Sequence, residues 1–387
     1  MKHRTHACRQ LRFLALLLAA LCAAPVPAPA AGQAKKIAPV LQPFVDSRVL
    51  AGAVTLVADK DKVLNLEAVG WMDIAAKKKM QTDCLFWIAS QSKPITAAAL
   101  MILVDEGKVS VDDPVEKYLS EFKDQWLAVE QDKDHVLLKK PKHPITVKNI
   151  LSHTSGMSFK SALEQPSLDL FPLAVRVGSY AMMPLQFEPD TKYQYSNAGI
   201  NTAGRIIEVV TGIKYEAFLD QRLFKPLGMK DTTFWPSGAR LKRLAKAYKP
   251  AKDGLEECPI GQLKYPLNDR ERQPMPAGGL FSTATDLSLF YRMLANNGEF
   301  AGKRVLSEQA VQQMTSKQTG DLPTPYGFGF AVGGGKIGHG GAYSTNSSYD
   351  REHNRITIFL VQHAGWAKEG KNIHPAFQKA ATDAFGK

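Results

Sequence analysis

Residues 85–106 read LFWIASQSKPITAAALMILVDE, and this segment organises the chain around it. Its first four residues are aromatic or aliphatic, as in a buried strand, and the residues after Pro94 are apolar at helical spacing. Proline is tolerated there because the first helical positions need no backbone donor. The sequence predicts a strand that leads directly into a long helix, which begins with Ser90, Gln91, Ser92 and Lys93.

Residues three apart share a face of a helix, so this spacing places the Ser90 hydroxyl beside the Lys93 amine. The helix N-terminus favours negative charge on the serine oxygen, and a neutral lysine can remove the hydroxyl proton. Free lysine has a pKa of about 10.4, so this chemistry requires burial or a nearby cation. The pattern alone is weak, because it recurs at Ser120 and Lys123, where we expect an ordinary polar turn.

A second group of polar residues is Tyr195, Ser196 and Asn197, which follows a turn-like Glu-Pro-Asp and precedes a helical pattern over 198–211. A phenol relays a proton if cationic neighbours depress its pKa, and an asparagine amide both donates to and accepts from a substrate. The alternative is a tyrosine at the edge of the core and an asparagine that caps the next helix.

The third group is His339, Gly340, Gly341 and Ala342, in a glycine-rich strand. Glycines let a substrate approach the backbone closely. The N–H of Ala342, together with that of Ser90, is expected to form an oxyanion hole, with His339 beside the substrate. The alternative is a flexible glycine loop with a surface histidine.

In this order the three groups resemble the serine β-lactamases and penicillin-binding proteins, in the class C and esterase-like branch with a His-x-Gly third motif. The resemblance extends from about residue 38 to 363 and includes landmarks at 151–157, 224–229, 276–283 and 326–329. It implies that Ser90 is the acylated nucleophile and Lys93 its activator. It also implies that Tyr195 is the general base and acid and that Asn197 positions the substrate. It also implies substrate contacts at His339, Gly340, Gly341 and Ala342, and a purely structural His153.

One departure from the family pattern concerns His339, which stands where β-lactamases have lysine. Lysine is charged and pairs with a substrate carboxylate, whereas histidine, with a pKa of about 6.5, is largely neutral at pH 7. Anchoring of a carboxylate should therefore be weaker. This favours ester hydrolysis, or cleavage of D-amino-acid peptides, over strong β-lactam hydrolysis.

The function expected from these observations is a carboxylesterase-like serine hydrolase with an acyl-enzyme on Ser90 and weak β-lactamase activity. Two alternatives remain: a β-lactamase or D-Ala/D-amino-acid peptidase acting on cell-wall peptides, and a non-catalytic sensor of β-lactams or peptidoglycan. The expected partners are a small ester, a β-lactam or a D-amino-acid peptide, and we expect a monomer. The sequence implies no cofactor and no metal site, since it lacks His-Glu-x-x-His and clustered Cys/His spacing.

The expected fold is α/β of the α+β type, with an antiparallel sheet flanked by helices and a mainly helical insertion. We place the sheet domain at residues 37–90 and 271–387 and the helical domain at 91–270. Residues 123–143 are charged and lack periodicity, which indicates a surface loop. Strands are expected at 53–58, 63–70, 338–349 and 356–362, and helices at 95–106, 147–151, 198–211, 215–223, 284–296 and 375–385.

The N-terminal residues predict export. Four basic residues precede an apolar run over 13–24 and a small-residue site at 28–30, which is typical of a signal peptide at residues 1–30. About twelve apolar residues are too few to span a membrane, which needs roughly 20. We therefore expect a secreted or periplasmic protein with no membrane span in its mature form. Cleavage would leave Cys84 and Cys258 as the remaining cysteines, and the sequence does not settle whether they pair.

Composition excludes several classes of protein. The chain has 387 residues, 44% of them hydrophobic and 22% charged, enough for a sizeable core and unlike a disordered chain. The formal net charge is +12, and four of the basic residues but none of the acidic residues precede position 31. The densest basic run, at 77–79, has no interleaved aromatic residues, so no nucleic-acid partner is expected.

Overall fold

The computed structural model describes residues 36–386. The signal peptide predicted at residues 1–30 lies outside this range. Within the range, no helix combines the length and the apolar character that a membrane crossing needs. Cys84 and Cys258 both carry free thiols, so no disulfide joins them.

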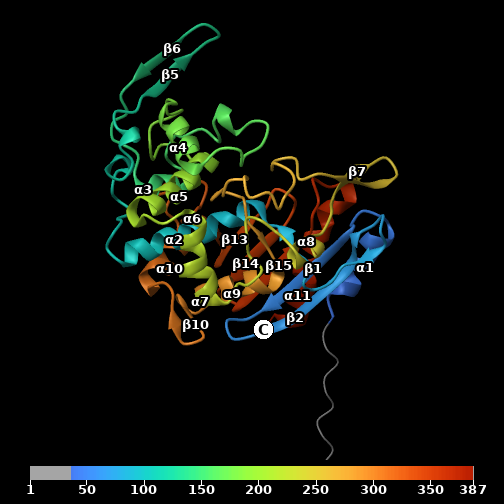
Figure 1. Cartoon of the computed structure of the whole chain (residues 1–387). Helices are drawn as coiled ribbons and strands as arrows, with labels where there is room; N and C mark the ends of the chain where they lie inside the picture. The colour runs from blue at the N-terminus through green and yellow to red at the C-terminus, as the bar shows by residue number, and fades with distance from the viewer. Residues whose placement is uncertain (1–35, 387) are drawn as a thin grey trace, which may run out of the picture. The chain divides into compact units, whose positions relative to one another are not determined.

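A seven-stranded antiparallel sheet forms the centre of the fold, and it draws its strands from both ends of the described chain (Figure 1). The spatial order is β12-β13-β14-β15-β1-β2-β3, in which β1 pairs with both β2 and β15. The strands are β1 (Gly52–Ala58), β2 (Val63–Asp73), β3 (Lys78–Lys79), β12 (Ala331–Gly333), β13 (Lys336–Gly340), β14 (Asn346–Asp350) and β15 (Arg355–Leu360). The expected joining of N-terminal and C-terminal strands in one antiparallel sheet is therefore confirmed.

The central strand β1 is buried over its whole length, because helices cover both faces of the sheet. Its alternate residues point to opposite faces, as in any strand. Ala53 and Val57 pack in one apolar cluster with residues of α1 (Ala38–Asp46) and α11 (Ile373–Phe385). Val54 and Leu56 pack in the main core on the other face, where α9 (Ala284–Ala295) contacts β1 and β15.

Helix α2 (Ser92–Asp105) is the buried helix predicted after Pro94, and residues 92–103 are all buried. It packs against α5 and α10. The remaining helices are α3 (Val147–Ser152), α4 (Leu173–Ala181), α5 (Asn197–Thr211), α6 (Tyr215–Leu219), α7 (Lys225–Leu227), α8 (Ala239–Lys242) and α10 (Glu308–Thr315). Short 3-10 turns are η1 (Ala89–Gln91), η2 (Val115–Lys117), η3 (Ser120–Phe122), η4 (Ala162–Glu164) and η6 (Lys368–Asn372), and η5 (Asp220–Phe224) is a π-helical turn.

Four small two-stranded sheets complete the fold. They pair β4 (Phe86–Trp87) with β9 (Phe281–Ser282), β5 (Leu127–Gln131) with β6 (Val136–Lys139), β7 (Ala247–Ala251) with β8 (Gly254–Cys258), and β10 (Glu299–Phe300) with β11 (Lys303–Arg304). The β4–β9 pair matters for function, because β4 is the strand predicted to lead into α2.

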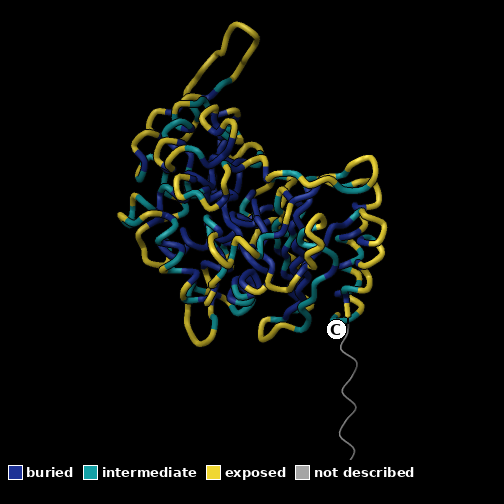
Figure 2. Tube along the Cα trace, turned by 45° about the vertical axis from the view of Figure 1, so that its right-hand side comes forward, coloured by how far each residue is buried: buried dark blue, intermediate teal, exposed yellow. Residues whose placement is uncertain are grey.

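Three expectations about local structure need correction. Residues 123–143 are not an irregular loop, because they include the β5–β6 hairpin, which projects beyond the helices and is exposed along most of its length (Figures 1 and 2). Helices α1, α4 and α10 were not predicted from periodicity. The long helix begins at Ser92 rather than at Ser90, which lies in the 3-10 turn η1. The domain boundaries at 90/91 and 270/271 stay a prediction.

Candidate active site

Ser90 occupies a tight turn between strand β4 and helix α2. The residue before it, Ala89, has φ 47°, a left-handed conformation that costs energy for a residue with a Cβ. The turn leaves Ser90 half-buried although its neighbours from Cys84 to Ala89 are buried. The strained turn therefore presents the Ser90 hydroxyl at a surface that the rest of the segment does not reach.

Lys93 is fully buried and makes three polar contacts through its amine. Nζ lies 3.1 Å from the Ser90 hydroxyl, 2.8 Å from Asn197 Oδ1 and 2.7 Å from the carbonyl oxygen of Ala277. Burial lowers the pKa of Lys93 well below its ordinary value, because desolvation disfavours the ammonium. The structure thus supplies the burial that the predicted chemistry of a Ser-x-x-Lys pair requires.

Tyr195 and Asn197 reach the same point from the start of α5. The Lys93 amine lies 4.6 Å from the centroid of the Tyr195 ring. Ser196 caps α5 by accepting from the N–H of Gly199, so the capping role considered for Asn197 belongs to its neighbour. This leaves the Asn197 side chain free to bind Lys93.

Burial raises the pKa of Tyr195, and hydrogen bonding to the Ser90 side chain opposes that shift. The direction is opposite to the depressed pKa that cationic neighbours would cause. Tyr195 is therefore a neutral phenol at pH 7, with a proton to give.

His339 lies on β13, and its ring centroid is 6.0 Å from that of Tyr195. Its Nδ1 contacts the carbonyl oxygen of Gly340 at 2.6 Å and its Nε2 contacts the Tyr326 hydroxyl at 3.0 Å. A carbonyl only accepts, so Nδ1 carries the proton and Nε2 accepts from the phenol. Burial, together with the charge on Lys93, lowers the pKa of His339 to about 3. Both ring nitrogens are occupied and the ring is neutral.

The turn after β13 packs directly on the nucleophile turn. A Cβ on Gly341 would lie 2.2 Å from Thr345 Oγ1 and 2.5 Å from the carbonyl oxygen of Ile88, so only glycine fits there. At Gly340 the nearest such contact would be 3.6 Å, which is ordinary packing. Ala342 follows in an exposed position. Its pairing with Ser90 in an oxyanion hole stays a prediction.

Sequence reasoning missed the aromatic side chains that surround this point. Tyr326 is buried, and its ring centroid lies 4.8 Å from that of His153, which in turn lies 4.6 Å from that of Tyr195. Tyr193 lies 5.5 Å from Tyr326, and burial raises its pKa to about 12. Phe159, which is 44% exposed, stacks on Tyr195. Two of these residues had a signal in the sequence. Tyr326 begins the family landmark at 326–329, and Tyr193 stands two residues before Tyr195.

His153, which was expected to have a purely structural role, makes a hydrogen bond within the described part of the chain at only one of its two ring nitrogens. Its Nδ1 accepts from the backbone N–H of Ser196 at 3.2 Å, but its buried Nε2 has no hydrogen-bond partner among the described residues. Burial lowers its pKa well below the ordinary value, because desolvation disfavours the charged ring. His153 is a neutral ring in the wall of the site.

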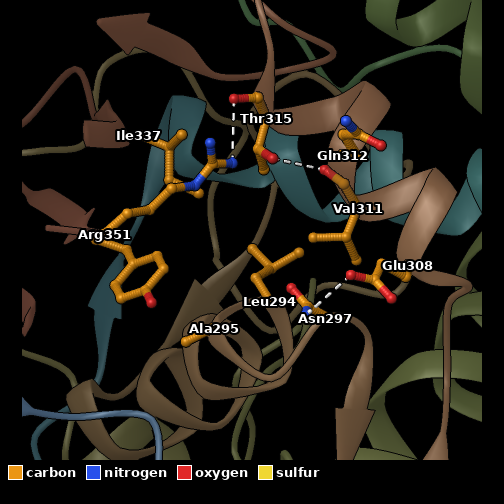
Figure 3. A pocket seen from close by; sticks show the side chains of 10 residues that line it. Leu294, Ala295, Asn297, Glu308, Val311, Gln312, Thr315, Ile337 and Arg351 are labelled. Carbon is orange, nitrogen blue, oxygen red and sulfur yellow. Dashed lines mark hydrogen bonds between the residues drawn. The ribbon is translucent and has the colours of Figure 1, made fainter. Parts of the chain in front are cut away.

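A separate surface pocket lies between α9, α10 and the strands β13 and β14 (Figure 3). Arg351 donates to the carbonyl oxygen of Thr315 at 3.1 Å, and Asn297 donates to Glu308 at 3.3 Å. Its lining contains none of the predicted site residues. We therefore place the candidate active site at Ser90.

Comparisons with known proteins show which family the chain belongs to. A family model described as Beta-lactamase matches residues 37–381. The uncharacterized protein MT1414 of Mycobacterium tuberculosis is 32% identical over 361 residues, which cover 82% of this chain and 87% of that protein. Esterase EstB of Burkholderia gladioli is 31% identical over 261 residues, which cover 64% of this chain and 61% of that protein.

The solved structure of EstCE1, described as a hydrolase with promiscuous acyltransferase activity, has the same fold. It superposes with a TM-score of 0.75 at 23% sequence identity and covers 90% of this chain and 97% of that chain. The expected fold class, an antiparallel sheet with helices in the β-lactamase arrangement, is confirmed by this match and by the family model. The chain therefore belongs to the Beta-lactamase family and is a serine hydrolase.

Proposed function

We propose that this protein hydrolyses neutral carboxylic esters through an acyl-enzyme on Ser90. The observation that carries the proposal is the state of His339, which is neutral and engaged at both ring nitrogens. It offers no charge to a substrate carboxylate. The amine of Lys93 is buried and already contacts three oxygens, so it is not free to pair with a substrate carboxylate. A substrate without a carboxylate suits such a site best.

The hydrogen-bond donors and acceptors around Lys93 Nζ support the role of Lys93 as the base. Asn197 Oδ1 and the carbonyl of Ala277 only accept, so they bind two N–H groups of the amine. The Ser90 hydroxyl can either accept or donate. A neutral amine, which has two N–H groups and one lone pair, therefore satisfies all three neighbours when Ser90 donates its proton to Nζ. This arrangement points the serine proton at its acceptor before substrate arrives.

Acylation then follows in two steps. Ser90 Oγ forms a bond to the ester carbonyl carbon while its proton moves to Lys93 Nζ, giving a tetrahedral oxyanion. The bond to the alcohol oxygen then breaks, and Tyr195 gives its proton to that oxygen as the alcohol leaves. The proton on Lys93 then passes to the phenolate oxygen of Tyr195, which restores the neutral amine and the neutral phenol. The N–H groups of Ser90 and Ala342 are the proposed donors to the oxyanion.

Deacylation uses the same groups in reverse. A water molecule attacks the acyl carbon and gives a proton to Lys93 Nζ, and the bond between Ser90 Oγ and the acyl carbon then breaks. Ser90 Oγ takes that proton back from Lys93, and the carboxylic acid leaves. The esterase EstB among the relatives supports an ester as the substrate.

The test compares purified protein with Ser90→Ala on a short-chain p-nitrophenyl ester and a chromogenic cephalosporin, in the presence of chelator. We expect rapid ester turnover, feeble cephalosporin turnover, and loss of both in the variant, by roughly 10³-fold or more for a nucleophile. Ser120→Ala is the matched control, because Ser120 begins the second Ser-x-x-Lys of this chain and lies in the turn η3. Ester turnover that survives in Ser90→Ala would refute the proposal, and faster cephalosporin than ester turnover would replace it with β-lactamase function.

A further inference from the structure

Helix α5 carries two buried asparagines one turn apart, and the predicted site includes only the first. Asn197 binds Lys93 directly. Asn201, which is fully buried, accepts from the backbone N–H of Ala277 through Oδ1 at 3.0 Å. The carbonyl of the same Ala277 residue accepts from Lys93 Nζ at 2.7 Å. Residues four apart on a helix share a face. One face of α5 therefore contacts Lys93 directly through Asn197 and indirectly through Asn201 and the Ala277 backbone.

The amide of Asn201 is fixed from its other end by a buried polar cluster. Its Nδ2 donates to the Tyr180 hydroxyl at 2.9 Å and lies 3.4 Å from Glu164 Oε1. Tyr180 donates to the same Glu164 oxygen at 2.8 Å, and the fully buried guanidinium of Arg176 lies 3.8 Å from it. Because the N–H of Ala277 is a donor and Glu164 is an acceptor, the amide has one orientation only. Asn201 thus joins a rigid cluster in the helical region to the backbone that binds Lys93.

We propose that Asn201 is a positioning residue for the reaction of Ser90, which acts by fixing the Ala277 residue whose carbonyl orients the Lys93 amine. The inference rests on the proposed function in that Ser90 and Lys93 carry the chemistry. Without the Asn201 acceptor, the N–H of Ala277 is left unpaired in the core and the Ala277 backbone is free to turn. A turn of that backbone moves one of the two obligatory acceptors of Nζ and so misdirects the lone pair that Ser90 needs.

The other titratable groups that face Lys93 come from different elements and do not contact Asn201. Tyr195 precedes α5, His153 follows α3, and His339 lies on β13. Helix α10 also packs on α2, but its charged residue Glu308 is exposed. A change at Asn201 therefore reaches Lys93 through the Ala277 backbone, with Glu164 and Arg176 as the charged groups behind it.

The experiment measures the rate at which a fluorophosphonate labels Ser90, as a function of pH, in full-length wild type, Asn201→Leu, Asn201→Ala and Asn201→Asp. Ser90 Oγ bonds to phosphorus, fluoride leaves, and the serine proton goes to Lys93, so the rate reports activation of the serine without requiring an ester substrate. The acidic limb reports protonation of Lys93. Thr202→Val is the matched control, because it removes a buried hydrogen bond to Ala198 on the same helix without touching Ala277.

We expect the leucine and alanine variants to label at least about tenfold more slowly at the pH plateau, since small misplacements of catalytic groups cost up to roughly 10²-fold. Their acidic midpoint should move to lower pH, because a carbonyl that accepts from Nζ stabilises the ammonium. Asn201→Asp keeps the acceptor for Ala277 but sets a second carboxyl group beside Glu164, so its plateau rate should lie between those of wild type and Asn201→Ala. Thr202→Val should lower Tm without moving rate or midpoint.

The outcomes separate two failures. If wild type is not labelled at Ser90, the proposed function fails. If wild type is labelled but neither apolar variant differs from Thr202→Val in plateau rate and midpoint, Asn201 has only a structural role and the inference is overturned. The alanine variant keeps the test decisive if the leucine variant does not fold, because alanine is a strong helix former and adds no bulk.

Discussion

At the scale of the residue, the histidine at position 339 carries the proposed preference for neutral esters. The His339 ring is neutral, and both of its nitrogens already bind the Tyr326 hydroxyl and the Gly340 carbonyl. A lysine at this position would be charged and would have N–H groups free for a substrate. The sequence predicted a neutral histidine from its ordinary pKa alone. The structure adds a second reason, since burial and the charge on Lys93 push the pKa further down, to about 3.

His339→Lys should therefore shift the preference of the enzyme toward substrates with a carboxylate. A charged hydrogen bond contributes about 1.5 kcal/mol or more, so the ratio of cephalosporin to ester kcat/KM should rise by roughly tenfold. His339→Gln is the control, because glutamine is neutral and disturbs the contact with Tyr326 in the same way. Equal ratios in the two variants would show that charge at this position does not set specificity.

Also at this scale, the limits of sequence reasoning are clear. Ser90, Lys93, Tyr195 and Asn197 could be named because their spacing follows local helix geometry and a family pattern. Asn201 could not, because its importance depends on Ala277, which is 76 residues away in the chain and is met only in the folded protein. Tyr326 was quoted as a landmark, but its contact with the third motif is likewise tertiary.

At the scale of the element, the site depends on the close packing of two turns from opposite ends of the chain. The turn after β13 meets the turn before α2 at Gly341, where the carbonyl of Ile88 leaves no room for a side chain. The sequence predicted glycines here for substrate access. The structure shows that Gly341 also allows the two turns to touch, and its contact with substrate stays a prediction.

Gly341→Ala should consequently lower ester kcat/KM by at least about tenfold, because a Cβ 2.5 Å from the Ile88 carbonyl oxygen must displace one of the two turns. Gly340→Ala is the matched control, since its Cβ would make only ordinary contacts, and it should stay within a few-fold of wild type. Steady-state kinetics with Tm measured alongside distinguishes the two. Similar kinetics for both variants would contradict the role of this packing.

At the scale of the whole molecule, the sheet was predictable because β1, β2 and β15 are rich in aliphatic residues and are bounded by turns. The helices that sequence reasoning missed include α4 and α10, which have only nine and eight residues. Helices this short depend on tertiary packing for their stability. The β5–β6 hairpin was read as a loop because its exposed strands show no alternation of polar and apolar residues.

Buried neutral histidines should make the whole fold sensitive to acid. Burial lowers the pKa of His363 to about 3, whereas an unfolded histidine has a pKa of about 6.5. Between these values the unfolded chain binds the extra proton, so stability is full above the unfolded pKa and is lost as pH falls toward the folded pKa. Each such histidine should lower the free energy of unfolding by roughly 1.4 kcal/mol for each unit by which pH falls in that window.

His363→Gln should flatten this dependence while keeping an acceptor for the N–H of Ala51, which His363 Nε2 binds at 3.1 Å. Urea unfolding at several pH values between 7 and 4 gives the slope. His135→Gln, the same change at an exposed position, is the control. Parallel slopes for wild type and His363→Gln would contradict the prediction.

The most direct test of the central claim is mass spectrometry of the protein quenched in acid during turnover of a short-chain p-nitrophenyl ester. The account predicts that intact protein gains the mass of one acyl group, that peptide mapping places it on Ser90, and that Ser90→Ala gains none. An acyl group on any other residue, or steady ester turnover by Ser90→Ala with no adduct in wild type, would contradict it.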